Sequence, residues 1–245
     1  AALPQIPSTE RRLSFMNNEY LKLNEARCKD CYACIRACPV KAIGFANSQA
    51  NIIADECVLC GNCYVTCPQN AKRIREDVPT VRDAIRAGRR VVASVAPSFI
   101  ADFDVGSIED LREALFQLGF FEVQEMAIGA EIVSREYEKI MASGETDVLI
   151  SSSCPPINLL IQKYYPEMLK YLAPVQSPME VHCRLLREQN PGAFVVFIGP
   201  CYAKEAEALD TGCCDAVLLF NEVKNWMHEA GVVPPNRGIQ TMRGG

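Results

Sequence analysis

One run of four cysteines occurs twice, with the same spacing, between residues 28 and 67. The first copy is Cys28-x2-Cys31-x2-Cys34-x3-Cys38-Pro39, and the second is Cys57-x2-Cys60-x2-Cys63-x3-Cys67-Pro68. The chain has 13 cysteines, and its first residues lack the apolar stretch of a secretion signal. Cysteines in such a chain are expected to bind metal rather than to form disulfides. The stretches 41–45 and 51–53 beside the runs predict short hairpin strands.

The spacing is that of the ligand run of bacterial ferredoxins, which hold [4Fe–4S] clusters. Three closely spaced thiolates reach three corners of a cubane, and in two-cluster proteins the fourth cysteine of each run ligates the other cluster. This predicts one cluster on Cys28, Cys31, Cys34 and Cys67, and a second on Cys57, Cys60, Cys63 and Cys38. A zinc site is the alternative, but zinc favours paired Cys-x2-Cys units. The segment is therefore expected to carry electrons.

Composition limits the class of protein. The chain has 245 residues, is 49% hydrophobic and 22% charged, and carries a net charge of −5. These values predict a folded protein of one or two domains in the cytoplasm. They favour neither nucleic acid nor a membrane as partner, because the net charge is acidic and the sequence has no long uncharged apolar run. Residues 1–20 are expected to form a flexible tail.

After about residue 78 the pattern alternates between strands and helices. Ser107 is a predicted N-cap, with leucines at helical spacing after it. The expected strands cover 90–95, 123–128, 147–151, 194–198 and 216–220, and the expected helices cover 107–118, 130–141, 157–164, 178–189 and 222–229. Such alternation predicts an α/β domain with a mostly parallel sheet over 78–245, after an α+β ferredoxin-like two-cluster domain over 21–77. Basic residues over 72–90 are interpreted as a solvated connection or, alternatively, as a docking face for an acidic redox partner.

The second domain resembles the H-cluster domain of [FeFe]-hydrogenases. The resemblance begins at Val95-Ala96-Pro97-Ser98 and continues through Gly129-Ala130-Glu131-Ile132. It is sharpest at Ser151-Ser152-Ser153-Cys154-Pro155, which is similar to the first H-cluster motif of the family. The segment Gly199-Pro200-Cys201-Tyr202-Ala203-Lys204-Glu205-Ala206-Glu207 is similar to the second motif.

The resemblance implies a role for several residues. Cys154 and Cys201 would ligate the [4Fe–4S] half of an H-cluster, and Lys204 would hydrogen-bond a cyanide of the diiron half. Pro97 and Ser98 would line that pocket. The catalytic positions implied are Ser153, Lys204 and Glu207.

The departures from the family pattern are informative. Ser153 stands where hydrogen-evolving members have a proton-shuttling cysteine, and a hydroxyl is a poorer relay than a thiol. Tyr137, Ile140 and Ala173 stand where the family's proton path has two glutamates and a serine, and Gly199 replaces a methionine. The pattern resembles the sensory or regulatory subclass, for which slow H2 oxidation or H2 sensing is expected.

The family's third motif, which supplies two further ligands, is absent from this sequence. The sequence is therefore expected to be a fragment, or the domain to be incomplete. Cys213 and Cys214 are interpreted as the start of a buried strand, with substitution for the missing ligands as the alternative. Cys183 is interpreted as a core or surface residue.

Three functions remain open from the sequence. The first is a slow or H2-sensing regulatory hydrogenase that exchanges electrons with a ferredoxin-like partner or serves a signalling domain, with H2 and protons as substrates. The second is a competent hydrogenase with a different proton route. The third is an electron-transfer or scaffold iron–sulfur protein without a diiron site.

Overall fold

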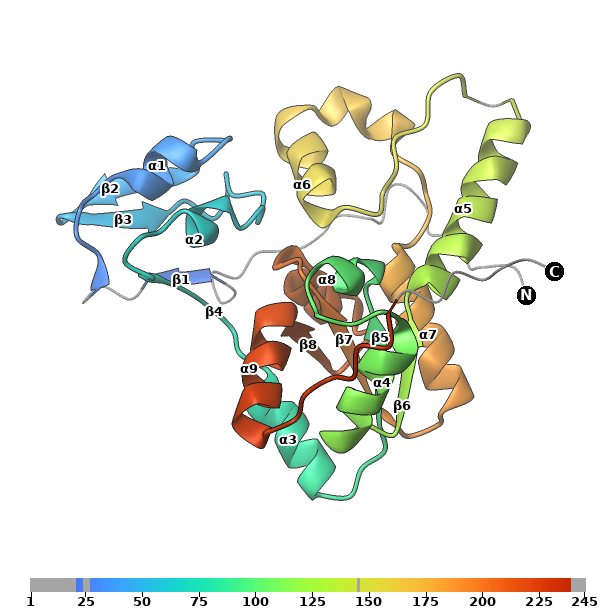
Figure 1. Ribbon diagram of the computed structural model, residues 1–245. Coiled ribbons are helices and arrows are strands. Elements are labelled where there is room, and N and C mark those ends of the chain that lie inside the picture. Colours follow the sequence, from blue (N-terminus) through green and yellow to red (C-terminus); the bar gives the residue numbers. More distant parts are fainter. Residues whose placement is uncertain (1–20, 24–26, 145, 239–245) are drawn as a thin grey trace. The chain divides into compact units, whose positions relative to one another are not determined.

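The computed structural model describes residues 21–23, 27–144 and 146–238 (Figure 1). The predicted tail over 1–20 lies outside these residues. The chain forms two compact units, and neither is continuous in sequence. The first unit comprises 1–75, 140–175 and 201–210, and the second comprises 76–139, 176–200 and 211–245.

The cysteine-rich part of the first unit is built from two short antiparallel pairs. Strand β1 (Leu21–Leu23) pairs with β4 (Lys72–Ile74), and β2 (Ile43–Ala46) pairs with β3 (Gln49–Ile52). The turn between β2 and β3 places Asn47 and Ser48 at φ 52° and 58°, as a two-residue hairpin with matched twist requires. The short helices α1 (Ala33–Ala37) and α2 (Asn62–Val65) each begin inside a cysteine run.

The apolar core of this part is small, and half of its buried residues are cysteines. Cys34, Cys38 and Cys63 are buried in one cluster with Ala42, Ile43 and Ala50. A segment of this size buries little apolar surface, and such domains are commonly stabilised by metal binding. Folding here is therefore expected to be coupled to occupation of the cysteines.

The rest of the first unit consists of short helical segments. They are α6 (Pro155–Tyr164), the 3-10 helix η3 (Pro166–Tyr171) and α8 (Ala203–Thr211). The predicted strand over 147–151 is wrong, because only Ile150 forms a bridge, to Leu172. Val148 is half exposed, so this stretch does not bury the alternate side chains that a sheet strand needs.

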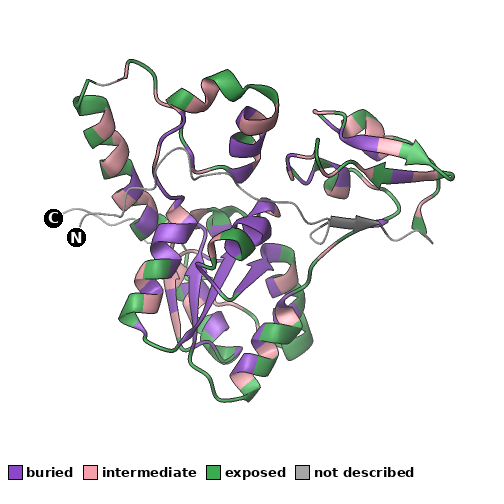
Figure 2. Ribbon diagram, turned by 180° about the vertical axis from the view of Figure 1, so that it is seen from behind, coloured by how far each residue is buried: buried purple, intermediate pink, exposed green. Residues whose placement is uncertain are grey.

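The second unit contains a four-stranded parallel sheet in the order β6-β5-β7-β8. The strands are β5 (Val91–Val95), β6 (Glu122–Glu125), β7 (Phe194–Gly199) and β8 (Ala216–Leu219). Every residue of β5, β7 and β8 is buried (Figure 2). This confirms the predicted α/β class with a parallel sheet, whose strands read as continuous apolar runs because both faces are covered.

Helices cover the sheet of the second unit. They are α3 (Val78–Arg86), α4 (Ile108–Gln117), α5 (Ala127–Ala142, which ends in the first unit), α7 (Pro178–Gln189) and α9 (Phe220–Ala230). Helix α7 packs on β5 and β7, α4 on β6, and α3 and α9 on β8. From β5 the chain crosses to β6 on one side of it, and from β6 it crosses back to β7 on the other side. Because such crossovers are right-handed, the helices α4 and α7 that they contain lie on opposite faces of the sheet. The sheet is therefore doubly wound.

Local signals set most of these boundaries. The Ser107 side chain accepts a hydrogen bond from the Asp110 N–H, which confirms the predicted cap of α4. The predicted strand over 123–128 ends instead at Glu125, because α5 begins at Ala127. A short 3-10 helix, η2 (Pro97–Ala101), follows β5.

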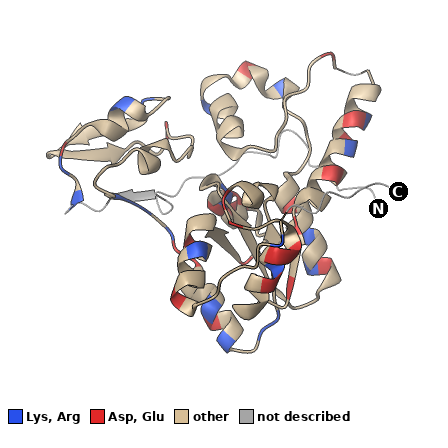
Figure 3. Cartoon of the chain, viewed as in Figure 1, with Lys and Arg blue, Asp and Glu red and all other residues tan. Residues whose placement is uncertain are grey.

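The basic stretch over 72–90 is largely solvated, as Arg73, Arg75, Arg86, Arg89 and Arg90 are exposed, but it is not an irregular connection. It forms β4 and α3, and several of its cations pack on aromatic rings: Arg82 on Trp226, Arg89 on Phe194 and Arg90 on Phe121. Charged residues lie on the helices around the sheet, whereas β5, β7 and β8 carry none (Figure 3). Within the described ranges, no helix has the length and apolar character needed to cross a membrane.

Candidate metal centres

The four cysteines predicted for the first cluster line a single cavity. Cys28, Cys31, Cys34 and Cys67 all border it, together with residues of α1 and β4. Cys67 comes from the second run, so the cavity draws its cysteines from both runs as the crossed ligand pattern requires. Four thiols around one cavity fit a cubane that takes one thiolate on each iron.

The second set gathers beside the first. Cys38 and Cys63 are buried, and the thiolates of Cys38 and Cys60 lie close enough to Cys57 to help raise its pKa. Burial is the main cause of that rise, and it raises the pKa of Cys63 to about 12. A thiolate is unfavourable at such a position unless a cation or metal compensates its charge. Without a metal, Cys57 and Cys63 therefore hold their protons, and cluster binding would have to displace them.

Backbone groups already point at the ligand sulfurs. The Leu59 N–H donates to Cys57 Sγ at 3.4 Å, and the Ala71 N–H donates to Cys67 Sγ at 3.3 Å. Hydrogen bonds of this kind tune the reduction potential of a cluster.

Lys72 is a buried cation between the two sets of cysteines. Its side chain is 3% exposed, borders the cavity of the first set, and donates from Nζ to the Ala50 carbonyl at 3.3 Å. Its charge acts to lower the pKa of Cys34 and of Cys63, against the larger effect of burial. The burial of Lys72 could not be predicted from the sequence, because a lysine after a ligand run gives no local signal of it.

The two H-cluster-type motifs meet in the first unit. Cys154 is the N-cap of α6, and Cys201 lies two residues before α8. Lys204 Nζ donates to the Ser153 carbonyl at 3.2 Å, and this hydrogen bond joins the two motifs. Burial raises the pKa of Cys201, Lys204 opposes the rise, and the nearby Cys154 adds to it. The structure thus brings Cys154, Cys201 and Lys204 together.

Lys204 is paired as well as buried. Its Nζ lies 2.5 Å from Glu207 Oε2, one turn further along α8, and both side chains are nearly inaccessible to solvent. Glu207, predicted as catalytic, is therefore placed to hold the ammonium in position. Ser153 is half-buried, and its Oγ accepts a hydrogen bond from the Ser151 hydroxyl.

The pocket residues Pro97 and Ser98 belong to the second unit. They begin η2 at the carboxyl end of β5, beside the end of β7. Gly199 ends β7, and a side chain there would meet two ring atoms of Phe197 at 2.7 and 2.8 Å. The methionine expected from the resemblance would therefore require the Phe197 ring to shift. Ala173, one of the altered relay positions, is fully buried, while Tyr137 and Ile140 lie on α5.

Tyr202 links the Cys201 loop to the cysteine-rich part of the same unit. Its ring packs 4.8 Å from that of Tyr64 in α2, and it lies against Gly61, whose φ of 76° favours glycine. Lys163 of α6 donates to the carbonyls of Ala54 and Cys57. The second cysteine run therefore adjoins both motif loops.

A third group of cysteines lies in the second unit. The sulfur atoms of Cys183, Cys213 and Cys214 lie within 4.8 Å of one another, and all three residues are buried. Cys213 and Cys214 precede β8, as predicted, but they also gather with Cys183, which was not predicted. The adjacent pair of cysteines was its only signal.

These arrangements define an iron–sulfur protein, with two [4Fe–4S] clusters as cofactors. The comparison with protein families agrees. A model of the 4Fe-4S dicluster domain matches residues 20–68, and a model of the iron-only hydrogenase large subunit, C-terminal domain, matches residues 89–242. The second match covers more than half of the chain, so the chain belongs to the iron-only hydrogenase family.

Curated relatives include both hydrogenases and an assembly factor. The chain is 26% identical to iron hydrogenase 1 of Clostridium pasteurianum, over 85% of this chain and 42% of the relative. It is 26% identical to the periplasmic [Fe] hydrogenase large subunit of Nitratidesulfovibrio vulgaris, over 87% of this chain and 58% of the relative. It is 24% identical to the cytosolic Fe-S cluster assembly factor NAR1 of Eremothecium gossypii, over 71% of this chain and 42% of the relative. The chain thus spans about half the length of these relatives or less.

Proposed function

We propose that this protein is a regulatory member of its family, which exchanges electrons between its two clusters and an H-cluster-like site at Cys154, Cys201 and Lys204. The observation that carries the proposal is the hydrogen bond from Lys204 to the Ser153 carbonyl, which joins the two motifs. The ferredoxin-like assignment of residues 21–77 is part of this proposal. The crossed cysteine cavity and the antiparallel pairs support it.

The cluster-like site would use this chain's residues in distinct roles. Cys154 and Cys201 supply thiolates, and Lys204 supplies a donor and a positive charge toward an anionic diatomic ligand. Glu207 holds the ammonium, and the Ser153 carbonyl fixes its direction. A complete third cubane with a diiron half requires further thiolates, which the family's third motif would supply in the complete polypeptide.

Slow turnover or H2 sensing is expected because the residues at the family's proton-relay positions are poor proton carriers. Ser153 offers a hydroxyl instead of a thiol, and its Oγ accepts a hydrogen bond from the Ser151 hydroxyl. Ala173 is buried and offers no donor or acceptor side chain. A signalling domain or a ferredoxin-like protein is the proposed electron or signal partner. A reducing compartment such as the cytoplasm suits 13 cysteines that are all unpaired.

Infrared spectroscopy and iron analysis test the proposal. The complete polypeptide that contains this sequence would be expressed with the hydrogenase maturation machinery. We expect bands from cyanide and carbonyl ligands, and iron above the roughly 8 atoms per chain that two cubanes supply. Cys201→Ser should abolish the bands and leave about 8 irons in place. Absence of the bands from the wild-type protein refutes the H-cluster-like site.

A serine-to-cysteine exchange separates the regulatory protein from a competent hydrogenase with another proton route. If the missing thiol limits turnover, Ser153→Cys should raise H2 evolution at least tenfold, whereas Ser151→Cys, two residues away, should not. Fast turnover of the wild-type protein, or no gain in Ser153→Cys, favours the competent hydrogenase.

The similarity to NAR1 supports a second candidate. In it, the chain is an electron-transfer or scaffold iron–sulfur protein without a diiron site. The family assignment and the eight run cysteines are common to both candidates. Iron of about 8 atoms per chain without infrared bands, after maturation, would favour this alternative.

A further inference from the structure

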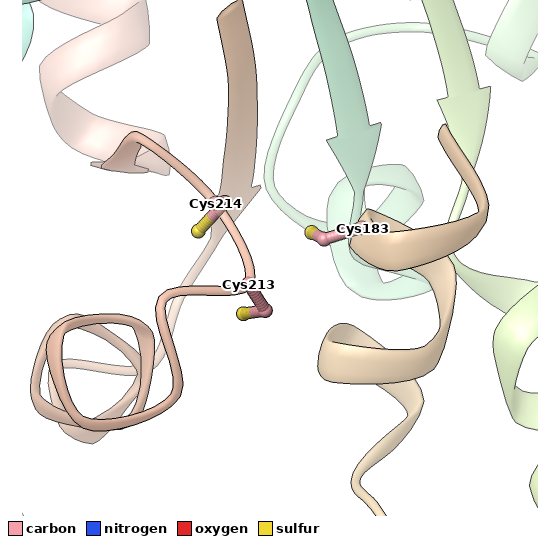
Figure 4. Close-up of side chains that lie close together, drawn as sticks. All are labelled: Cys183, Cys213 and Cys214. Carbon is pink, nitrogen blue, oxygen red and sulfur yellow. The ribbon is translucent and has the colours of Figure 1, made fainter. Parts of the chain in front are cut away.

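The second unit holds three buried thiols that neither the two clusters nor the proposed H-cluster-like site uses. Cys183 lies on α7, and Cys213 and Cys214 lie in the segment that leads into β8 (Figure 4). Their exposed fractions are 0%, 1% and 8%. The three sulfur atoms lie within 4.8 Å of one another. We infer that Cys183, Cys213 and Cys214 form a binding site for a single thiophilic metal ion.

The spacing of the sulfurs fits a mononuclear site. Thiolates bound to one zinc ion at about 2.3 Å lie roughly 4 Å apart, whether the arrangement is tetrahedral or trigonal. The sulfurs already lie within reach of that separation, and small side-chain rotations would complete it. Thiolate ligands select Zn2+ or Cu+ over hard cations such as Mg2+ or Ca2+.

The surroundings are polar for a core position. Ser94 Oγ lies 2.8 Å from His182 Nδ1 and also interacts with the Cys183 thiol. The Thr211 hydroxyl accepts from the Cys213 N–H, and the Arg187 guanidinium donates to the Cys213 carbonyl. Three thiols packed only as small hydrophobes have no need of such groups, whereas a charged metal–thiolate site does.

A bound ion would also link two elements of the second unit. Binding of a cation would release the thiol protons of the ligating cysteines to solvent as the metal–sulfur bonds form. The ion would then tie α7 to the segment before β8, two elements that otherwise meet through side-chain packing and a few hydrogen bonds.

Cadmium binding to the iron-loaded full chain tests the site. The protein, with its run cysteines occupied by iron, would be dialysed against limiting Cd2+, and bound cadmium and iron would be counted together. We expect one Cd2+ per chain with the iron content unchanged, and at least tenfold weaker binding in Cys183→Ala and Cys213→Ala. The control is Val181→Ala, which removes a buried side chain from the same helix but no sulfur; it should bind as wild type.

Other outcomes overturn the inference. Equal binding by all variants, or iron loss in step with cadmium uptake, would place the ion on the cluster ligands. A disulfide involving Cys183 in the anaerobically isolated protein would assign the group a redox role instead. If the alanine variants fail to fold, cadmium X-ray absorption of the wild-type protein carries the test: three sulfur neighbours support the site, and a shell of oxygen or nitrogen refutes it. The same binding measurement is made with Cu+ and with Zn2+. Binding of Cu+ but not Zn2+ would identify the bound ion as three-coordinate Cu+.

Discussion

Lys204 Nζ lies 2.5 Å from Glu207 Oε2, and neither side chain is more than 11% exposed. The same ammonium donates to the Ser153 carbonyl, so one cation serves both motif loops. A buried ion pair gives little net stability, but loss of one partner leaves an uncompensated charge in the protein interior. The pair therefore fixes the position of Lys204 more than it adds to stability.

Removal of Glu207 should destabilise the protein strongly. Glu207→Ala leaves the Lys204 charge buried without its carboxylate, at a cost of about 3–5 kcal/mol in the free energy of unfolding. Asp83→Ala is the matched control, because it breaks an exposed pair with Arg86 and should cost less than about 1 kcal/mol. Urea denaturation of the iron-loaded proteins measures both. Comparable losses in the two variants would show that Lys204 is solvated when unpaired.

Much of the second unit could be predicted from local patterns. The buried strands at 91–95 and 194–199 are continuous apolar runs, and Ser107 marks the start of α4 by its own hydrogen bond. Strand ends beside helices were less certain, because Val123 to Ile128 is apolar enough for a strand while Ala127 already begins α5. Hydrophobic pattern and residue propensity depend on residues close in sequence, and they predicted these strands and this helix start correctly.

Contacts between distant segments could not be predicted in this way. The first unit contains residues 140–175 and 201–210 together with the cysteine runs. The sequence of these two stretches does not predict that they pack with the runs. Burial of Lys72 depends on the Ala50 carbonyl across the fold, and the group of Cys183, Cys213 and Cys214 depends on the packing of α7. The ligand pattern within each run could be predicted, because its cysteines are close to one another in the sequence.

Replacement of Lys72 should lower the reduction potentials of both clusters. Its buried charge lies near Cys34 of one set and Cys63 of the other, and it favours the reduced, more negative state of each cluster. For a charge about 8 Å away at an effective dielectric constant of about 20, the expected shift in Lys72→Met is on the order of 50–100 mV.

A redox titration followed by electron paramagnetic resonance measures the shift. Arg73→Met is the matched control, since Arg73 is exposed on the same strand and should move the potentials far less. Both variants should keep about 8 irons per chain. Equal shifts in the two variants would show that Lys72 acts only through the overall charge.

The crossed ligand pattern predicts which cluster is bound by the last cysteine of each run, Cys38 or Cys67. Cys67 borders the cavity with Cys28, Cys31 and Cys34, so Cys67→Ser should perturb the cluster of the first run. Cys38→Ser should perturb the cluster of the second run, because Cys38 lies near Cys57. Each variant should retain one unaltered spectroscopic signal, and the two retained signals should differ. Loss of the same signal from both variants contradicts the crossed assignment.

His182 should make the protein less stable in mild acid. Burial lowers its pKa from 6.5 to about 4, although Glu122 acts in the opposite direction. The ring is neutral in the folded protein, where Nδ1 accepts from the Ser94 hydroxyl and Nε2 donates to Gln124 Oε1. Between pH 6.5 and about 4 the unfolded chain binds a proton that the folded chain does not, so stability falls as the pH falls through this window.

The total loss across that window is about 3 kcal/mol, since each pKa unit corresponds to about 1.4 kcal/mol. Unfolding free energies measured between about pH 7 and pH 5 should therefore decline more steeply in wild type than in His182→Gln. The exposed histidine provides the control, because His228→Gln should keep the wild-type slope. The imidazole resonances give a second readout that needs no unfolding: the His182 shifts should stay constant down to about pH 5. Titration of His182 near its ordinary pKa would mean that water reaches the ring, and the pH dependence would then have to come from other groups.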